Sequence, residues 1–273
     1  MRTSGYPRGL AWPPLAYLIL LFLIPTAIVV SYSCLKRDFY GQVLREWSAE
    51  GWKQAADPIT LRILGRSVLL STVVTLGCVL AGYPCALFLA HSSESWRRAG
   101  IFLIAFPLIT SLLLRIYGWM NLLPLEWRGN VWTVGLVMMV NYLPFMVLPL
   151  LRACERLDHT LVEASLDLGA TPWQSFWQIT WPLTRAGLWA GCALVFIPSA
   201  GEYLVPHFIG EGKVEVLGSQ IVKQFMERRN WPYAAACAVW LLALVALPAL
   251  FMASRARESA TRASSVERKL DAQ

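Results

Sequence analysis

The chain has 273 residues, of which 56% are hydrophobic and 15% are charged, and its formal net charge is +7. A soluble globular protein carries about 25% charged residues, so this composition argues against a soluble domain. The apolar residues gather in runs of about 20, the length of a helix that crosses a bilayer. We therefore predict an all-α integral membrane protein whose positive charge faces anionic lipid rather than nucleic acid.

Six transmembrane helices are expected within a single domain, residues 1–273. They are placed at residues 12–32, 66–90, 100–123, 131–151, 187–208 and 233–253. The first apolar run follows Arg2 and Arg8, as a secretory signal would, but no small-residue cleavage site comes after it. We therefore expect a retained first helix.

Prolines interrupt most of these helices, and residues 196–206 in the fifth are the most broken, with Pro198 and Pro206. Each proline removes a backbone donor and bends a helix. Membranes tolerate broken helices where they pack on protein or line a cavity. The fifth helix is therefore expected to border a pathway through the bundle.

A polar loop at residues 152–185 separates the fourth helix from the fifth, and it is expected to contain two short helices. The first, residues 162–168, places Glu163 and Asp167 on one face because they are four residues apart. Gly169 is expected to end this helix, since glycine adopts a left-handed conformation there at little cost.

The second short helix of this loop is predicted over residues 173–179. Thr171 has the side chain of an N-cap, and Pro172 suits the first helical position. We expect the pair Trp181-Pro182 to stop this helix before the fifth transmembrane helix begins.

The same loop resembles the cytoplasmic signature loop of ABC importer permeases, which reads EAA, then Gly after three residues, then Ile-x-Leu-Pro. The matching residues are Glu163, Ala164, Gly169, Ile179 and Pro182, while Ser165 and Trp181 depart from the pattern. In that family the loop's short helix docks into a groove on an ATPase subunit. The resemblance thus implies a cytoplasmic coupling helix with the coupling residues Glu163, Ala164, Asp167, Gly169, Ala170 and Pro172.

Residues 114–120, 196–206 and 224–233 further resemble permeases of spermidine/putrescine ABC importers, particularly the first of the two permease chains. This resemblance implies a type I importer permease domain in the bacterial inner membrane. It also implies a second homologous permease, two ATPase subunits that hold ATP and Mg²⁺, and a periplasmic or extracellular substrate-binding protein. No cofactor is expected on this chain.

Glu202 is the sharpest candidate for contact with a solute, because an ionisable side chain within a membrane span is costly unless it is paired or faces water. Beside it, Tyr203 offers a ring face, and the pair suits a cationic amine. The alternative is that Glu202 satisfies backbone groups freed by Pro206 or pairs with a partner chain. Further candidates for the pathway lining are Tyr117, Trp119, Asn141 and Tyr142.

Arg115, in the third helix, is expected to have a structural role, as an ion pair or a hydrogen-bond donor within the bundle. Other solutes stay open within the importer class: an iron chelate, a sulfate-like anion or an amino acid. An ion-gradient-driven secondary transporter is a further alternative, although Arg115 and Glu202 are few ionisable groups for that mechanism.

Several motifs of enzymes and metal proteins are missing from the sequence. It has no GxxxxGK[ST], HExxH or GxSxG motif, its three histidines are scattered, and its six cysteines form no CxxC pair. We therefore expect no enzyme activity, no ATP site and no metal site on this chain. With both termini cytoplasmic, 12 basic residues lie inside and 10 outside, so the orientation rests mainly on the signature loop.

Overall fold

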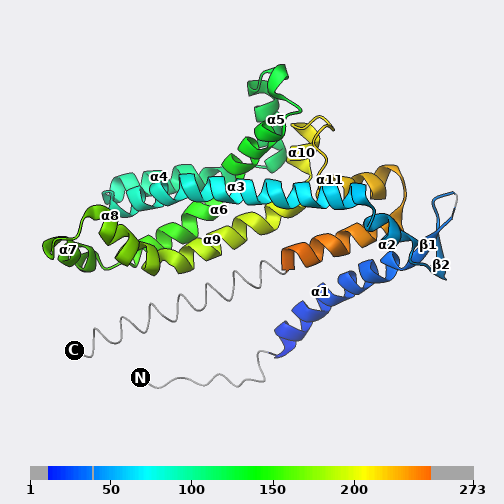
Figure 1. Ribbon diagram of the computed structural model, residues 1–273, viewed down its shortest axis with the longest axis horizontal. Helices are drawn as coiled ribbons and strands as arrows, with labels where there is room; N and C mark the ends of the chain where they lie inside the picture. Colours follow the sequence, from blue (N-terminus) through cyan, green and yellow to red (C-terminus); the bar gives the residue numbers. More distant parts are fainter. Residues whose placement is uncertain (1–11, 39, 247–273) are drawn as a thin grey trace. The chain divides into compact units, whose positions relative to one another are not determined.

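The computed structural model describes residues 12–38 and 40–246, and the chain folds into two compact units. One unit comprises Met1–Arg62 with Gln220–Leu242, and the other comprises Ile63–Ser219 with Ala243–Gln273. Figure 1 shows that the described chain is dominated by helices.

The first unit combines apolar helices with a small polar cap. Its elements are α1 (Trp12–Ser33), β1 (Leu35–Arg37), β2 (Val43–Trp47), α2 (Glu50–Ala55), η4 (Lys223–Glu227) and the helix Trp231–Ala246, which continues past this unit. The strands pair antiparallel. Asn230 Nδ2 donates to Gln54 Oε1 at 3.0 Å, and the hydroxyls of Thr60 and Tyr233 lie 2.7 Å apart. The polar segment between α1 and the start of α3 (Pro58) is therefore an ordered cap with its own hydrogen bonds.

The second unit holds the long helices and both regions in which site residues were predicted. Its elements are α3 (Pro58–His91), which begins in the first unit, α4 (Glu94–Ile109), α5 (Leu112–Leu122), η2 (Leu125–Trp127), α6 (Val131–Glu155), α7 (His159–Asp167), α8 (Pro172–Ser175), η3 (Phe176–Thr180), α9 (Trp181–Gly201), α10 (Leu204–Phe208) and α11 (Leu217–Val222). Its core is apolar and lies mainly between α3, α6 and α9. Buried side chains there include Val74, Val134, Met138, Met146, Leu150 and Val195.

Two glycines one helical turn apart bring α9 close to α6. A Cβ atom at Gly187 would lie 2.8 Å from the carbonyl oxygen of Pro149, and one at Gly191 would lie 3.2 Å from that of Met146. Small residues spaced four apart let helix backbones approach closely in membranes, where packing rather than water exclusion drives association. The two glycines of α9 therefore explain how its backbone comes close to that of α6.

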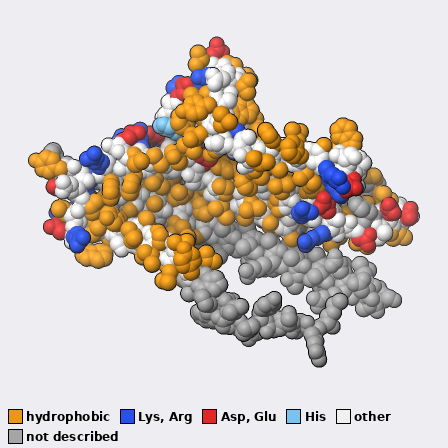
Figure 2. All heavy atoms as spheres, turned by 180° about the vertical axis from the view of Figure 1, so that it is seen from behind, with side chains coloured by type: hydrophobic (Ala, Val, Ile, Leu, Met, Phe, Trp, Pro, Cys, Tyr) orange, Lys and Arg blue, Asp and Glu red, His pale blue; other side chains and the backbone are white. Residues whose placement is uncertain are grey.

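Among the described residues, three helices are long and apolar enough to cross a membrane: α3, α6 and the continuous helix Pro172–Gly201. The bent pair α4 and α5 makes a fourth if it counts as one span, and Tyr17–Ser33 and Trp231–Ala246 are shorter apolar helices. These elements fall on the six expected spans, although residues 247–253 lie outside the described part. Figure 2 shows hydrophobic side chains across the flank of the molecule. The count of six remains a prediction.

The third expected span, residues 100–123, is two helices rather than one. The axes of α4 and α5 differ by 99°, and the intervening Thr110 and Ser111 are both extended. The Thr110 hydroxyl donates to the Pro107 carbonyl at 3.1 Å, which satisfies a carbonyl at the helix end. The helix breaks at a short polar pair inside an apolar run, and hydropathy alone does not reveal this break.

The pair Trp181-Pro182 does not stop a helix, contrary to the sequence-based expectation. The helix that begins at Pro172 runs through the π turn η3 and continues as α9 to Gly201. In the π turn the Trp181 amide donates to the Phe176 carbonyl, five residues back. The wider turn rearranges the hydrogen bonds just where Pro182 lacks an amide, so the proline is accommodated in the helix.

Replacing Gly187 by a large residue tests the α6–α9 contact. We expect Gly187→Leu to lower the thermal unfolding midpoint of the detergent-purified protein, because overpacking a tight contact costs about 1–3 kcal/mol. Gly65→Leu is the matched control, since no atom lies within 4 Å of a Cβ placed there. Equal midpoints for the Gly187 variant and the wild type would contradict the close packing.

Candidate functional site

A buried carboxylate lies where the fifth expected span breaks. Glu202 follows the last residue of α9, and the residue is only 9% exposed. Its Oε2 accepts a hydrogen bond from the Tyr142 hydroxyl at 2.6 Å, and its Oε1 accepts one from the Leu204 amide at 2.9 Å. Hydrogen bonds to an ionised group are stronger than those between neutral groups. Two donors from different elements therefore hold this carboxylate in a fixed orientation.

The break itself explains why Glu202 is needed there. Glu202 is extended, and α10 starts two residues later, so the first amides of α10 have no partner within their own helix. The Glu202 carboxylate satisfies one of them, that of Leu204. The backbone role considered for Glu202 is therefore present in the structure, with Leu204 as the donor rather than a group freed directly by Pro206.

A second polar pair lies one residue earlier on α6. Arg115, on α5, donates through Nη1 to Asn141 Oδ1 at 2.8 Å, and Asn141 Nδ2 donates to the Val137 carbonyl at 2.9 Å. Arg115 Nε is buried and has no hydrogen-bond partner among the described residues. Adjacent residues of α6, Asn141 and Tyr142, thus bind a cationic side chain from α5 and an anionic one from the α9–α10 break.

The other predicted pathway residues are three aromatic side chains. Among the described contacts, none of them has a hydrogen bond with Glu202, Tyr142, Asn141 or Arg115. Tyr203 is 37% exposed, and Tyr117 is 52% exposed with its ring centroid 5.9 Å from that of Phe208. Trp119 is partly buried against the core. The structure therefore brings together Glu202, Tyr142, Asn141 and Arg115 and leaves the three aromatic side chains at the margin.

The signature loop has the local geometry that the sequence suggests. Asp158 caps α7 by accepting from the Thr160 amide at 3.0 Å, so the helix begins at His159, earlier than expected. Gly169 has φ +89°, the left-handed conformation expected after a helix end. Thr171 and Gln174 form a reciprocal capping box at the start of α8.

The predicted coupling residues lie at the surface. Exposed positions are Glu163, Ala164, Asp167, Gly169 and Pro172, whereas Ala170 is intermediate. Large apolar side chains of the same segment are exposed as well, among them Leu168 at 88% and Trp173 at 69%. Exposed apolar surface beside charged residues is typical of a protein–protein contact.

Sequence reasoning missed the contact that joins the two short helices. Ser165 Oγ lies 2.7 Å from Ser175 Oγ, between α7 and α8. Ser165 replaces an alanine of the signature pattern, so the departure supplies a polar link. A serine at one position does not identify its partner, and only the fold pairs it with Ser175.

Aromatic packing connects the loop to α3. The ring of Tyr83 lies 5.6 Å from both Phe176 and Trp181, and its hydroxyl is 2.6 Å from the Thr184 hydroxyl. Trp173 stacks on Phe176 with ring centroids 6.0 Å apart. Aromatic pairs at such distances add to the energy of burial. The π turn is therefore fixed to a long apolar helix rather than free at the surface.

The sequence profile of the family described as "Binding-protein-dependent transport system inner membrane component" matches residues 74–257. The chain is 32% identical over 272 residues to the spermidine/putrescine transport system permease protein PotB of Haemophilus influenzae, covering 92% of this chain and 94% of that protein. It is 34% identical over 251 residues to the PotB of Escherichia coli, with 85% and 90% coverage.

A more distant relative is the putative 2-aminoethylphosphonate transport system permease protein PhnU of Salmonella typhimurium. It is 28% identical over 280 residues, which cover 93% of this chain and 94% of PhnU. Among solved structures, a bacterial ABC transporter that imports the acidic polysaccharide alginate contains a chain with a TM-score of 0.67 and 16% identity. The similarity covers 90% of this chain and 96% of that chain, and it concerns the fold.

The matched family region, the near full-length relatives and the fold agree with one another and with the signature loop. The chain belongs to the binding-protein-dependent transport system inner membrane component family, and it is a permease subunit of an ABC importer, a multi-pass inner-membrane protein and not an enzyme.

Proposed function

We propose that this importer carries polyamines, with putrescine and spermidine as its solutes. The observation that carries the proposal is the buried Glu202 carboxylate at the α9–α10 break, in a chain similar to two PotB permeases over most of its length. A buried carboxylate attracts an ammonium group strongly because water does not screen it. Tyr203 and Tyr117 supply exposed ring faces on the neighbouring elements, which suit cation–π contact.

In this proposal the chain is one of two homologous permeases, and two ATPase subunits hold ATP and Mg²⁺. A substrate-binding protein delivers the polyamine from the opposite side of the membrane. Both termini are cytoplasmic, because the signature loop has to meet a cytosolic ATPase. This chain binds no cofactor of its own, in keeping with the missing Walker motif.

The continuous helix Pro172–Gly201 supports a direct coupling mechanism. Its 30 residues extend for about 45 Å at the usual helical rise, against about 30 Å for the hydrocarbon core of a bilayer. The first turn of this helix, which forms α8, therefore lies well outside the membrane. Its last residue is Gly201, next to Glu202. When ATP closes the ATPase dimer, a displacement of α8 is transmitted along this helix to the break at Glu202. Hydrolysis then returns the bundle to its inward-facing state.

A second candidate solute is a 2-aminoethylphosphonate-like zwitterion, which the relationship to PhnU favours. Such a solute carries an anionic group as well as an ammonium. The Nε atom of Arg115 is buried and has no partner among the described residues, and a guanidinium suits a phosphonate oxygen. Polyamine remains the main proposal because the PotB relatives are more similar in sequence.

The proposed assembly predicts what accompanies the chain from its native membrane. With a C-terminal affinity tag and gentle extraction, an ATPase and a second permease should co-purify, together with a binding protein when its ligand is present. The ligand released from that binding protein by denaturation should be a polyamine by mass spectrometry. A chain that elutes alone in several detergents would contradict the assembly, and an aminophosphonate ligand would replace the solute.

Neutralising the buried carboxylate tests the polyamine site. We expect Glu202→Gln to reduce putrescine uptake by about 10-fold or more, since a hydrogen bond to a charged group contributes about 1.5–3 kcal/mol. Glu126→Gln is the matched control, because Glu126 is exposed on η2. Uptake by proteoliposomes should then distinguish the two variants, and unchanged uptake with Glu202→Gln would remove the carboxylate from the polyamine site.

The coupling role of the signature loop predicts a specific response at Gly169. Gly169→Val should lower uptake by about 10-fold, because a left-handed φ costs about 1–2 kcal/mol for an L residue and more for a β-branched one. Gly169→Asn should retain most of the uptake, since asparagine tolerates this conformation. No atom lies within 4 Å of the added Cβ, so the two variants differ only in the strain of the left-handed φ, and Gly169→Val should lower the thermal unfolding midpoint by a few degrees more than Gly169→Asn. Equal uptake by both variants would contradict the assignment.

A further inference from the structure

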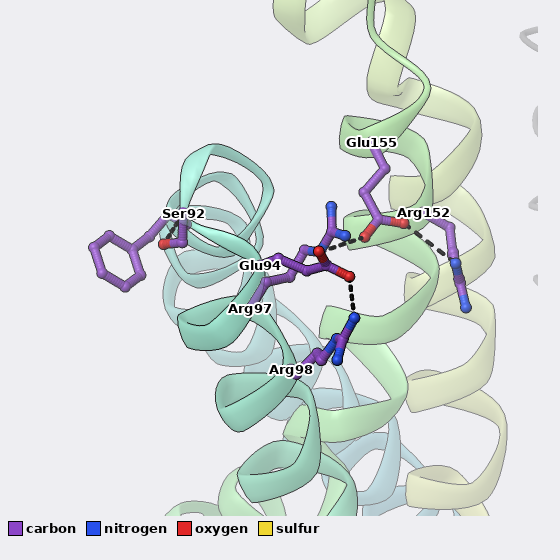
Figure 3. Close-up of polar contacts among 7 residues, drawn as sticks. Ser92, Glu94, Arg97, Arg98, Arg152 and Glu155 are labelled. Atoms are coloured by element: carbon purple, nitrogen blue, oxygen red, sulfur yellow. Dashed lines mark hydrogen bonds and ion pairs between the residues drawn. The ribbon is translucent and has the colours of Figure 1, made fainter.

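Five charged side chains meet where the first turn of α4 faces the last turn of α6. Figure 3 shows Glu94, Arg97 and Arg98 on α4 and Arg152 and Glu155 on α6. The Glu155 carboxylate lies between two cations: its Oε1 is 3.8 Å from Arg97 Nε, and its Oε2 is 3.3 Å from Arg152 Nη1. This residue has no part in the sites described above.

The two kinds of ion pair in this group differ in what they connect. Arg98 pairs with Glu94 within α4, and both side chains are more than 60% exposed. Such surface pairs contribute little to stability. The Glu155 side chain is only 20% exposed and its pair with Arg97 links two helices, so this contact is better shielded from solvent.

Glu155 also has a special place along the chain. It is the last residue of α6, and the coupling helix α7 begins only four residues later, at His159. Within the short connection Leu157 is buried, which leaves little freedom between α6 and α7. A displacement of α7 therefore reaches the end of α6 directly.

The bent pair α4 and α5 is attached to α6 on both sides of its 99° bend. At its start Arg97 pairs with Glu155, and beyond the bend Arg115 on α5 donates to Asn141. Gly100 on α4 also lies against the end of the Leu89 side chain on α3, and α4 packs along α6. Without the ion pair, α4 would keep this packing but lose its polar link to the base of the coupling loop.

We propose that Glu155 is a positioning residue for transport: its carboxylate makes α4 follow the coupling helix when the ATPase subunits move. The displacement of α4 then passes through the bend at Thr110 and Ser111 to α5. There Arg115 binds Asn141, whose neighbour Tyr142 donates to Glu202. This inference rests on the proposed coupling function. It adds a second route to the one along α9, through α4 and α5.

The test uses the complete importer with its binding protein in proteoliposomes and measures ATP hydrolysis and putrescine uptake together. Glu155→Gln keeps the side-chain shape and removes the charge. We expect the number of ATP molecules hydrolysed per putrescine imported to rise about fivefold, the size of effect expected when one residue that carries coupling is changed. The ATPase rate and the thermal unfolding midpoint should stay close to those of the wild type. Glu94→Gln, which disrupts the pair inside α4, is the matched control and should leave the ratio unchanged.

A charge exchange separates this role from simple structural support. Arg97→Glu alone should uncouple as Glu155→Gln does, and the double variant Arg97→Glu with Glu155→Arg should restore the ratio to within about twofold. Arg152 is 80% exposed and has room to turn away from the new arginine.

If Glu155→Gln leaves the ratio of ATP hydrolysed to putrescine imported unchanged, the inference is overturned. The proposed importer function still stands in that case, provided that the wild type takes up putrescine. A parallel loss of hydrolysis, uptake and thermal stability, without rescue by the exchange, would also overturn the inference, since that is the result of a structural defect. A wild-type assembly without ATP-dependent putrescine uptake would overturn the proposed function and this inference together.

Discussion

The close approach of α6 and α9 at Gly187 and Gly191 is the constraint on which the rest of this structure depends. Each helix carries one part of both candidate regions, the signature loop and the polar cluster at Glu202. α9 is continuous with the signature loop at one end and stops at Glu202 at the other. α6 presents Asn141 and Tyr142 in its middle and Glu155 at its end. Because the two backbones are in contact, no flexible connection separates the signature loop from the polar cluster, which is what the proposed coupling requires.

The buried carboxylate of Glu202 illustrates how a broken membrane helix supports a charged group. A break exposes backbone amides that have no partner in hydrocarbon, and a carboxylate in the same place has no water. Each is costly alone, whereas the hydrogen bond from the Leu204 amide to Glu202 reduces both costs. The Tyr142 hydroxyl then fixes the second oxygen. The same geometry that stabilises the break therefore holds a negative charge at a defined place, which is why a structural role and a role in solute binding are compatible here.

What could be predicted from the sequence was mostly local. The left-handed Gly169 and the cap at Thr171 with Pro172 follow from the preferences of single residues at helix ends, and both are confirmed. The break after Gly201 was indicated by neighbouring prolines and a polar residue. The bend at Thr110 and Ser111 was not predicted, because hydropathy treats a continuous apolar run as one helix.

The contacts between distant segments could not be derived from the sequence. Arg115 was expected to bind within the bundle, but the choice of Asn141 depends on how α5 turns after the bend. The pairing of Glu155 with Arg97 depends on the angle between α4 and α6. At Pro182 a local rule gave the wrong prediction. A proline normally ends a helix, yet here a π turn supported by Tyr83, Phe176 and Trp181 accommodates it. The fold is shared with an alginate importer at 16% identity, so it does not select the solute. In the proposed function that selection comes from side chains such as Glu202 and Arg115, whose charges the common fold leaves free to vary.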